Sequence, residues 1–175
     1  MSTAVGILLL LVTVNPPRRR SELPPDRQVV AAGAVLTFLV LIALGLVGEW
    51  LLEGLSISIP SFHVAVGLVL AIRSVVDFST ALPPGGEEMP GRRAALVPVF
   101  FPVLFRPELA LVAVGVAVDA GRPTLLAGAL LAMAAVVGWC ALPSNRRFDR
   151  AAGVAFSAGL MVLAVDRIVD GIFAL

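Results

Sequence analysis

Six long apolar runs, separated by short polar segments, constrain the fold of this chain more than any other feature of its sequence. The runs lie near residues 3–14, 28–52, 60–78, 94–118, 124–142 and 151–175. A helix that crosses a bilayer needs about 20 mostly apolar residues. None of the runs alternates between apolar and polar residues as a barrel strand would, and an open sheet in lipid would leave backbone groups unpaired. The sequence therefore predicts an all-α membrane protein with about six transmembrane helices.

The composition favours the same class of protein and excludes several functions. Of the 175 residues, 59% are hydrophobic and 14% are charged, whereas an ordinary soluble domain has about 25% charged residues. The net charge of +1 gives the chain no general attraction for nucleic acid. One cysteine, Cys140, and one histidine, His63, provide neither a disulfide nor a metal-binding cluster. No nucleophile–base pair or phosphate-binding glycine loop is present, so we expect no enzyme activity, cofactor or metal.

The arginines predict how the helices are oriented. Arginines gather in the first, third and fifth loops, whereas the second and fourth loops hold few charges. The arginines of the odd loops are Arg18, Arg19, Arg20 and Arg27, then Arg92 and Arg93, then Arg146, Arg147 and Arg150. Because basic residues mark cytoplasmic loops, we expect these loops in the cytoplasm and both termini outside the plasma membrane.

The two halves of the chain are predicted to be inverted repeats within one transmembrane domain. Repeat one covers 1–78, a cytoplasmic loop covers 79–93, and repeat two covers 94–175. Three helices on each side of the loop give the halves opposite orientations, which is a common plan for transporters.

The first and fourth predicted helices are each broken by proline. Asn15 and Pro16 close the first apolar run, and Pro102 and Pro107 interrupt the fourth. Proline removes a backbone donor, and interrupted segments at matching positions of two repeats indicate a binding site. Together with Arg106, these residues form the predicted solute site. The alternative is a pair of kinks that helix packing tolerates.

Arg106 is the charge that the sequence places deepest in the membrane. It follows Arg93 by about 20 Å along a helix, at about 1.5 Å per residue, which puts it near the middle of the bilayer. A charge there is costly and usually faces a partner or an aqueous cavity. Arg106 is predicted either to hold a substrate carboxylate or to pair permanently with Glu108 or another helix.

Further charges near helix ends have two interpretations. Asp166 and Asp170 share a face of the last helix, with Arg167 in reach of Asp170. They predict either proton or cation coupling or a local salt bridge.

Four more residues are assigned from their positions alone. Arg73 and Asp77 are spaced for a structural ion pair, and Asp119, at a helix end, is expected to be solvated. His63 is either a proton switch or an interfacial residue.

Several motifs resemble those of the MarC family, whose members look related to the LysE-type exporters. The segment 48–67, GEWLLEGLSISIPSFHVAVG, resembles the family's passage from helix two to helix three. Asn15-Pro16 is similar to its first-helix motif, Pro98, Pro102 and Pro107 are similar to its second-half prolines, and Asp170-Gly171-Ile172 is similar to its last helix end. In two places the chain departs from the family: Arg18–Arg20 intrude in the first motif, and Arg106 and Glu108 replace two glycines in the second.

The resemblance implies transport of small neutral amino acids, and the added Arg106 would favour a more anionic solute. We therefore expect a plasma-membrane secondary transporter or exporter of a small organic solute, such as an amino acid, working by alternating access. Its partners would be the lipid bilayer and the solute. The alternative is a non-transporting membrane scaffold or assembly partner. The sequence leaves open the substrate, the coupling ion, the direction of transport and the oligomeric state.

Overall fold

The computed structural model describes all residues except 21, 25, 80–95, 144 and 175. The described part is helical and contains no strand, which confirms the predicted all-α class. The predicted cytoplasmic loop 79–93 lies almost wholly outside the described residues. In chain order the elements are α1 (Thr3–Val14), α2 (Pro16–Arg19), α3 (Arg27–Gly54), α4 (Ile59–Ser79), the π-helix η2 (Leu96–Leu104), α5 (Pro107–Ala120), α6 (Arg122–Ala141) and α7 (Arg146–Phe173).

Four of the described helices, α3, α4, α6 and α7, are long and apolar enough to cross a membrane. Their outward faces carry large apolar side chains, among them Val35, Leu39, Leu68, Ile72, Leu130 and Val162. Exposed apolar surface of this extent is unusual on a soluble monomer and suits contact with lipid chains. The membrane class is therefore supported by four helices, and the count of six crossing helices is not confirmed.

The other two predicted spans are each divided into two short pieces. In the first segment α1 has 12 residues and ends at Val14, and the next residue, Asn15, has a left-handed backbone with φ of 50° and ψ of 67°. Asparagine is one of the few residues besides glycine that tolerate this conformation, and Pro16 then starts α2 on a new axis. In the second segment η2 ends at Leu104, and Pro107 starts the 14-residue α5 after an extended Arg106. Proline suits a first helical position because its missing N–H would have had no partner there.

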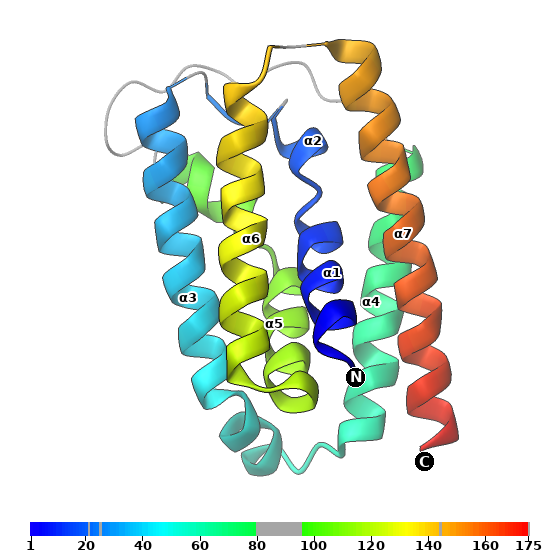
Figure 1. Ribbon diagram of the computed structural model, residues 1–175. Helices are drawn as coiled ribbons and strands as arrows, with labels where there is room; N and C mark the ends of the chain where they lie inside the picture. The colour runs from blue at the N-terminus through cyan, green and yellow to red at the C-terminus, as the bar shows by residue number, and fades with distance from the viewer. Residues whose placement is uncertain (21, 25, 80–95, 144, 175) are drawn as a thin grey trace.

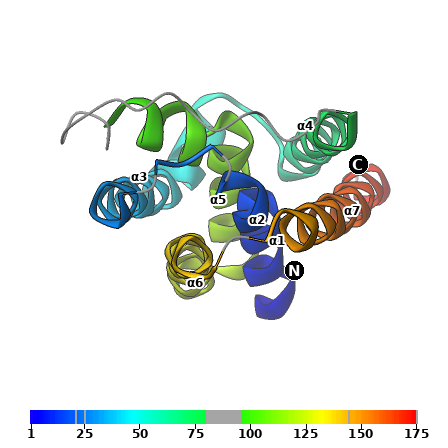
Figure 2. The ribbon, with the colours of Figure 1, turned by 90° about the horizontal axis from the view of Figure 1, so that it is seen from above.

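Helices α1, α2 and α5 lie between the pair α3 and α6 and the pair α4 and α7 (Figures 1 and 2), whereas η2 lies at the edge against α3. Helices α1 and α5 contact one another, and α6 packs against both. Helix α7 packs along α4, and α3 lies against α5 and α6. The centre of α5 is fully buried at Val112, Ala113 and Val116. Both termini lie toward the end where α3 passes into α4, called here the α3–α4 end; the other is the α2 end.

One predicted boundary is corrected by the structure. The last helix was expected to begin near residue 151, with Arg146, Arg147 and Arg150 in a loop, but α7 begins at Arg146. The Asn145 side chain accepts hydrogen bonds from the backbone N–H groups of Arg147 and Phe148, at 3.2 and 3.4 Å. The first N–H groups of a helix have no intrahelical acceptor, and this side chain supplies one. The helix therefore begins at polar residues before the apolar run.

The packing of α4 against α7 predicts a sharp difference between two glycines. A Cβ at Gly67 would lie 2.7 Å from the Ala164 carbonyl oxygen and 2.9 Å from the Ile168 nitrogen, which are backbone atoms. A Cβ at Gly138 would meet nothing within 4 Å. We expect Gly67→Ala to lower the free energy of unfolding by about 1–3 kcal/mol through overpacking. Gly138→Ala should leave it equal or higher, since alanine favours helix. Thermal unfolding in detergent measures both, and equal stability of the two variants would contradict the close α4–α7 contact.

Candidate functional site

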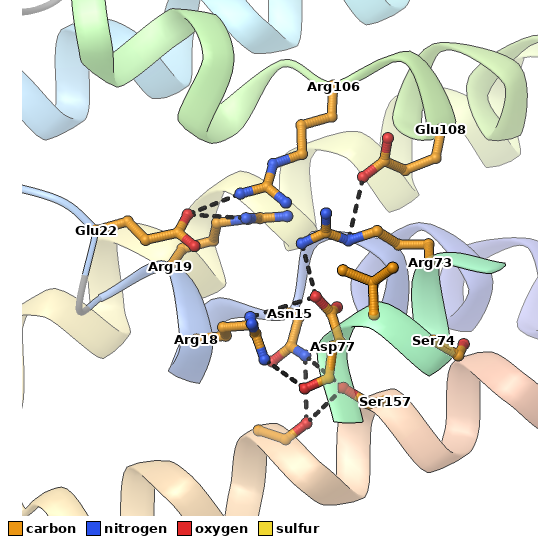
Figure 3. A network of polar contacts seen from close by, with 12 residues as sticks. Asn15, Arg18, Arg19, Glu22, Arg73, Ser74, Asp77, Arg106, Glu108 and Ser157 are labelled. Atoms are coloured by element: carbon orange, nitrogen blue, oxygen red, sulfur yellow. Dashed lines mark hydrogen bonds and ion pairs between the residues drawn. The ribbon is translucent and has the colours of Figure 1, made fainter. Parts of the chain in front are cut away.

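The two broken segments meet at a buried network of charged side chains in the half of the bundle toward the α2 end (Figure 3). The side chains come from α2 and the segment after it, from α4, and from the start of α5. Their exposed fractions run from 2% for Asp77 to 21% for Arg73. The charged members are Arg18, Arg19, Glu22, Arg73, Asp77, Arg106 and Glu108.

Glu22 joins the two breaks directly. Its Oε2 atom lies 2.9 Å from Nη1 of Arg19 and 2.9 Å from Nη2 of Arg106. Arg19 also donates from Nε to the carbonyl oxygen of Val14, at 3.1 Å. Val14 is the last residue of α1, so the guanidinium satisfies a carbonyl near the helix end, where the intrahelical pattern stops. A single carboxylate oxygen thus connects the end of the first broken segment to the start of α5.

Asp77 is the centre of the second part of the network. Its Oδ1 atom lies 2.6 Å from Nη2 of Arg73 and 3.3 Å from Nε of Arg18. Arg18 also donates from Nη1 to the Asp77 carbonyl oxygen, at 2.6 Å. Arg73 lies 3.5 Å from Oε1 of Glu108 through its Nε atom. The predicted Arg73–Asp77 ion pair within α4 is confirmed. The contacts with Arg18 and Glu108 connect it to α2 and α5.

Arg106 and Glu108, whose pairing is one of the two predicted for Arg106, each contact a further residue of the network. Arg106 has extended backbone and contacts Glu22, whereas Glu108 lies in the first turn of α5 and contacts Arg73. Figure 3 shows the two side chains reaching separate parts of the network. The other pairing predicted for Arg106, with a residue of another segment, is the one formed with Glu22.

The structure also corrects the expectation that Arg18 and Arg19 are loop charges, because both are buried. The sequence placed these arginines by the end of an apolar run, and the turn of α2 folds them back into the bundle.

Asn15 anchors the first break to α7. Its side chain is 1% exposed, and its Nδ2 atom donates to the Gly153 carbonyl oxygen and to Ser157 Oγ, both at 3.2 Å. Its Oδ1 atom is buried without a hydrogen-bond partner among the described residues. Pro16, next in the chain, is buried at the start of α2. Asn15 is therefore a member of the polar centre, as its place in the predicted site required.

The remaining predicted site residues take different positions. Pro107 is exposed at the first turn of α5, and the backbone of Pro102 lies within η2; its side chain lies outside the described residues. Asp166 and Asp170 are exposed on α7, away from the network. Of the predicted site residues, the structure thus brings Asn15 and Arg106 into one polar region (Figure 3), with Pro16 next to Asn15 in the chain. The prediction did not include every member of this region. It missed Glu22, which no motif marks because it stands in a short polar segment.

A second polar cluster lies at the α3–α4 end. Asp119 Oδ2 lies 2.6 Å from Nη1 of Arg167 and 2.9 Å from Nε2 of His63. Arg167 also contacts the Met1 sulfur. The Asp119 side chain is therefore 8% exposed and paired rather than solvated, and Arg167 pairs with it rather than with Asp170. A carboxylate enclosed by helices competes better for a guanidinium than a carboxylate on an exposed face, where water is the alternative partner.

A cavity of about 330 Å³ lies beside the network and not within it. Its lining residues are Arg20, Leu23, Pro24, Arg27, Val30 and Cys140, at the start of α3 and the end of α6. Arg20 donates to the carbonyl oxygens of Leu142 and Pro143, just past the end of α6. These contacts satisfy carbonyls at the C-terminal end of a helix.

No family model matches the chain, and no curated protein or solved structure matches it either. The resemblance to the MarC family thus stays a prediction from the motifs.

Asn15 offers a test of the first break. Asn15→Ala loses the hydrogen bonds to Gly153 and Ser157, each worth about 1 kcal/mol, and places alanine in a left-handed conformation that costs about 1–2 kcal/mol. Asn15→Gly loses the same bonds without the backbone cost. We expect the stability order Asn, Gly, Ala in denaturant unfolding of the purified protein. An alanine variant as stable as the glycine variant would contradict the left-handed backbone at residue 15.

Asp77 offers a test of the network. Asp77→Asn removes the charge that faces Arg18 and Arg73, and breaking a buried ion pair from one side costs on the order of 3–5 kcal/mol. We expect a large loss of thermal stability, with Glu49→Gln as the control because Glu49 is exposed near the end of α3. Equal melting temperatures for the two variants would show that Asp77 is hydrated rather than enclosed.

Proposed function

We propose that this protein is a plasma-membrane secondary transporter or exporter of a small organic solute that carries a carboxylate, such as an amino acid. The observation that supports the proposal is the meeting of two broken segments at buried guanidinium groups, with Arg19 and Arg106 sharing one oxygen of Glu22. Charges enclosed in a membrane protein are costly and usually functional. Arginine suits this role because its planar guanidinium matches a carboxylate.

The geometry of the second break favours an anionic solute. The Arg106 carbonyl accepts hydrogen bonds from Leu109 and Ala110, so Arg106 caps α5 at its N-terminal end. That end carries the positive pole of the helix dipole. A carboxylate near Arg106 would meet both the guanidinium and this pole. Discontinuous helices use their N-terminal ends in this way in other transporters.

The order of elements supports two inverted repeats. Residues 1–78 run through a broken segment and two long helices, and residues 94–175 do the same. With the arginine-rich loops in the cytoplasm, both termini would lie outside. The resemblance to the MarC family implies the same arrangement. In this proposal the solute binds between the two broken segments, and the halves rock against each other to expose it to either side.

The proposal predicts flux that depends on Arg106. In proteoliposomes with a proton or sodium gradient, we expect the parent chain to move at least one of labelled L-alanine, L-serine and L-aspartate. Arg106→Gln should lower the rate at least about tenfold, the loss expected for about 1.4 kcal/mol of binding. Arg150→Gln is the matched control, because Arg150 is exposed in the first turns of α7. Absence of flux in the parent across the panel would contradict the proposal.

A second candidate is a non-transporting membrane scaffold or assembly partner, and one observation favours it. Arg106 already has a protein partner in Glu22, and the described cavity of about 330 Å³ lies at Arg20 and Arg27 instead. Under this alternative the network is permanent and only holds the broken segments together. Arg106→Gln would then change stability, with no flux to lose.

A further inference from the structure

We infer that Glu22 is a tethered anion that occupies the carboxylate position of the solute in this conformation. Binding of an anionic solute and the bridge from Glu22 to Arg19 and Arg106 would then exclude each other. This inference rests on the proposed transport function and names its substrate class: a small organic acid whose carboxylate replaces that of Glu22.

The convergence of two guanidinium groups carries the inference. Arg19 belongs to the first broken segment and Arg106 to the second, yet both lie 2.9 Å from the same oxygen of Glu22. Two such cations repel each other in a buried setting, so the position requires an anion. A carboxylate from a solute has the same shape, charge and acceptor atoms as the Glu22 carboxylate. It can therefore make the same charge-assisted bonds.

Glu22 is the carboxylate of the network best able to leave. Asp77 and Glu108 are held on α4 and α5 and have side chains 2% and 8% exposed, whereas the Glu22 side chain is 15% exposed. Glu22 lies between the end of α2 and the start of α3, where its N–H donates to the Arg19 carbonyl oxygen in a turn. It can swing out without moving a long helix.

The bridge also gives the solute a physical effect on the fold. While Glu22 holds both arginines, it ties the segment after α2 to the start of α5. Glu22 is covalently part of the first segment and reaches the second through its ion pair with Arg106. A solute carboxylate that takes over the arginines breaks this ion pair and leaves only the solute between the two segments. The empty site is then closed by its own side chain, and the loaded site is free to rearrange. A ligand shifts a conformational balance only through such a difference in contacts.

The test compares binding of succinate with that of its uncharged analogue succinamide to the purified full chain, by isothermal titration calorimetry in detergent. Glu22→Gln keeps the size of the side chain and removes the competing charge. We expect it to bind succinate about tenfold more tightly than the parent does. Glu53→Gln is the control, because Glu53 is exposed near the end of α3, and should bind as the parent does. Glu22→Gln combined with Arg106→Gln should lose the gain, and succinamide should bind weakly throughout.

Succinate affinity that is equal or weaker in Glu22→Gln, or absent in both proteins, would overturn the inference. If Glu22→Gln does not fold, Glu22→Asp replaces it: the shorter side chain bridges less well, so succinate should again bind more tightly than to the parent. Flux of labelled succinate in the same variants separates this inference from the proposed function. Tighter binding without flux in any variant retains the anion site and rejects transport. Flux in the parent with unchanged affinity in Glu22→Gln retains transport and rejects the tethered anion.

Discussion

The shared oxygen of Glu22 is the contact on which the polar centre of this molecule depends. The chain has two helix breaks, one after α1 and one before α5, and each break leaves backbone groups without intrahelical partners and brings an arginine inside. In a membrane these groups cannot form hydrogen bonds with water. Glu22 offsets the repulsion between Arg19 and Arg106, and Arg19 in turn satisfies the Val14 carbonyl. The remaining members of the network, centred on Asp77, extend the same arrangement to α4.

The two ends of the bundle solve the problem of buried charge in different ways. Toward the α2 end, arginines from several segments share carboxylates across helix breaks. At the α3–α4 end, Asp119 near the end of α5 joins His63 and Arg167 in a compact cluster. The first arrangement joins segments on either side of two helix breaks, whereas the second joins α4, α5 and α7 near their ends. The helix breaks at the α2 end are the reason why the solute site is proposed there.

Much of the fold follows from local patterns in the sequence. The four long helices α3, α4, α6 and α7 match apolar runs, because a membrane helix is marked by length and hydropathy alone. The breaks at Asn15-Pro16 and before Pro107 also follow from proline chemistry. The start of α7 does not, because the Asn145 cap extends the helix into polar sequence that hydropathy assigns to a loop.

The sequence by itself determined that this is a helical membrane protein, where its helices break, and that Arg73 and Asp77 pair, since each of these depends on residues near in the chain. Only the tertiary structure decided which charges meet across the bundle. Glu22 and Arg106 are 84 positions apart, and Asp119 and Arg167 are 48 apart. Ion pairs of this kind are set by how helices pack, because an arginine takes whichever carboxylate the packing encloses with it. Spacing along the chain therefore suggested Glu108 and Asp170, and the packing selected Glu22 and Asp119.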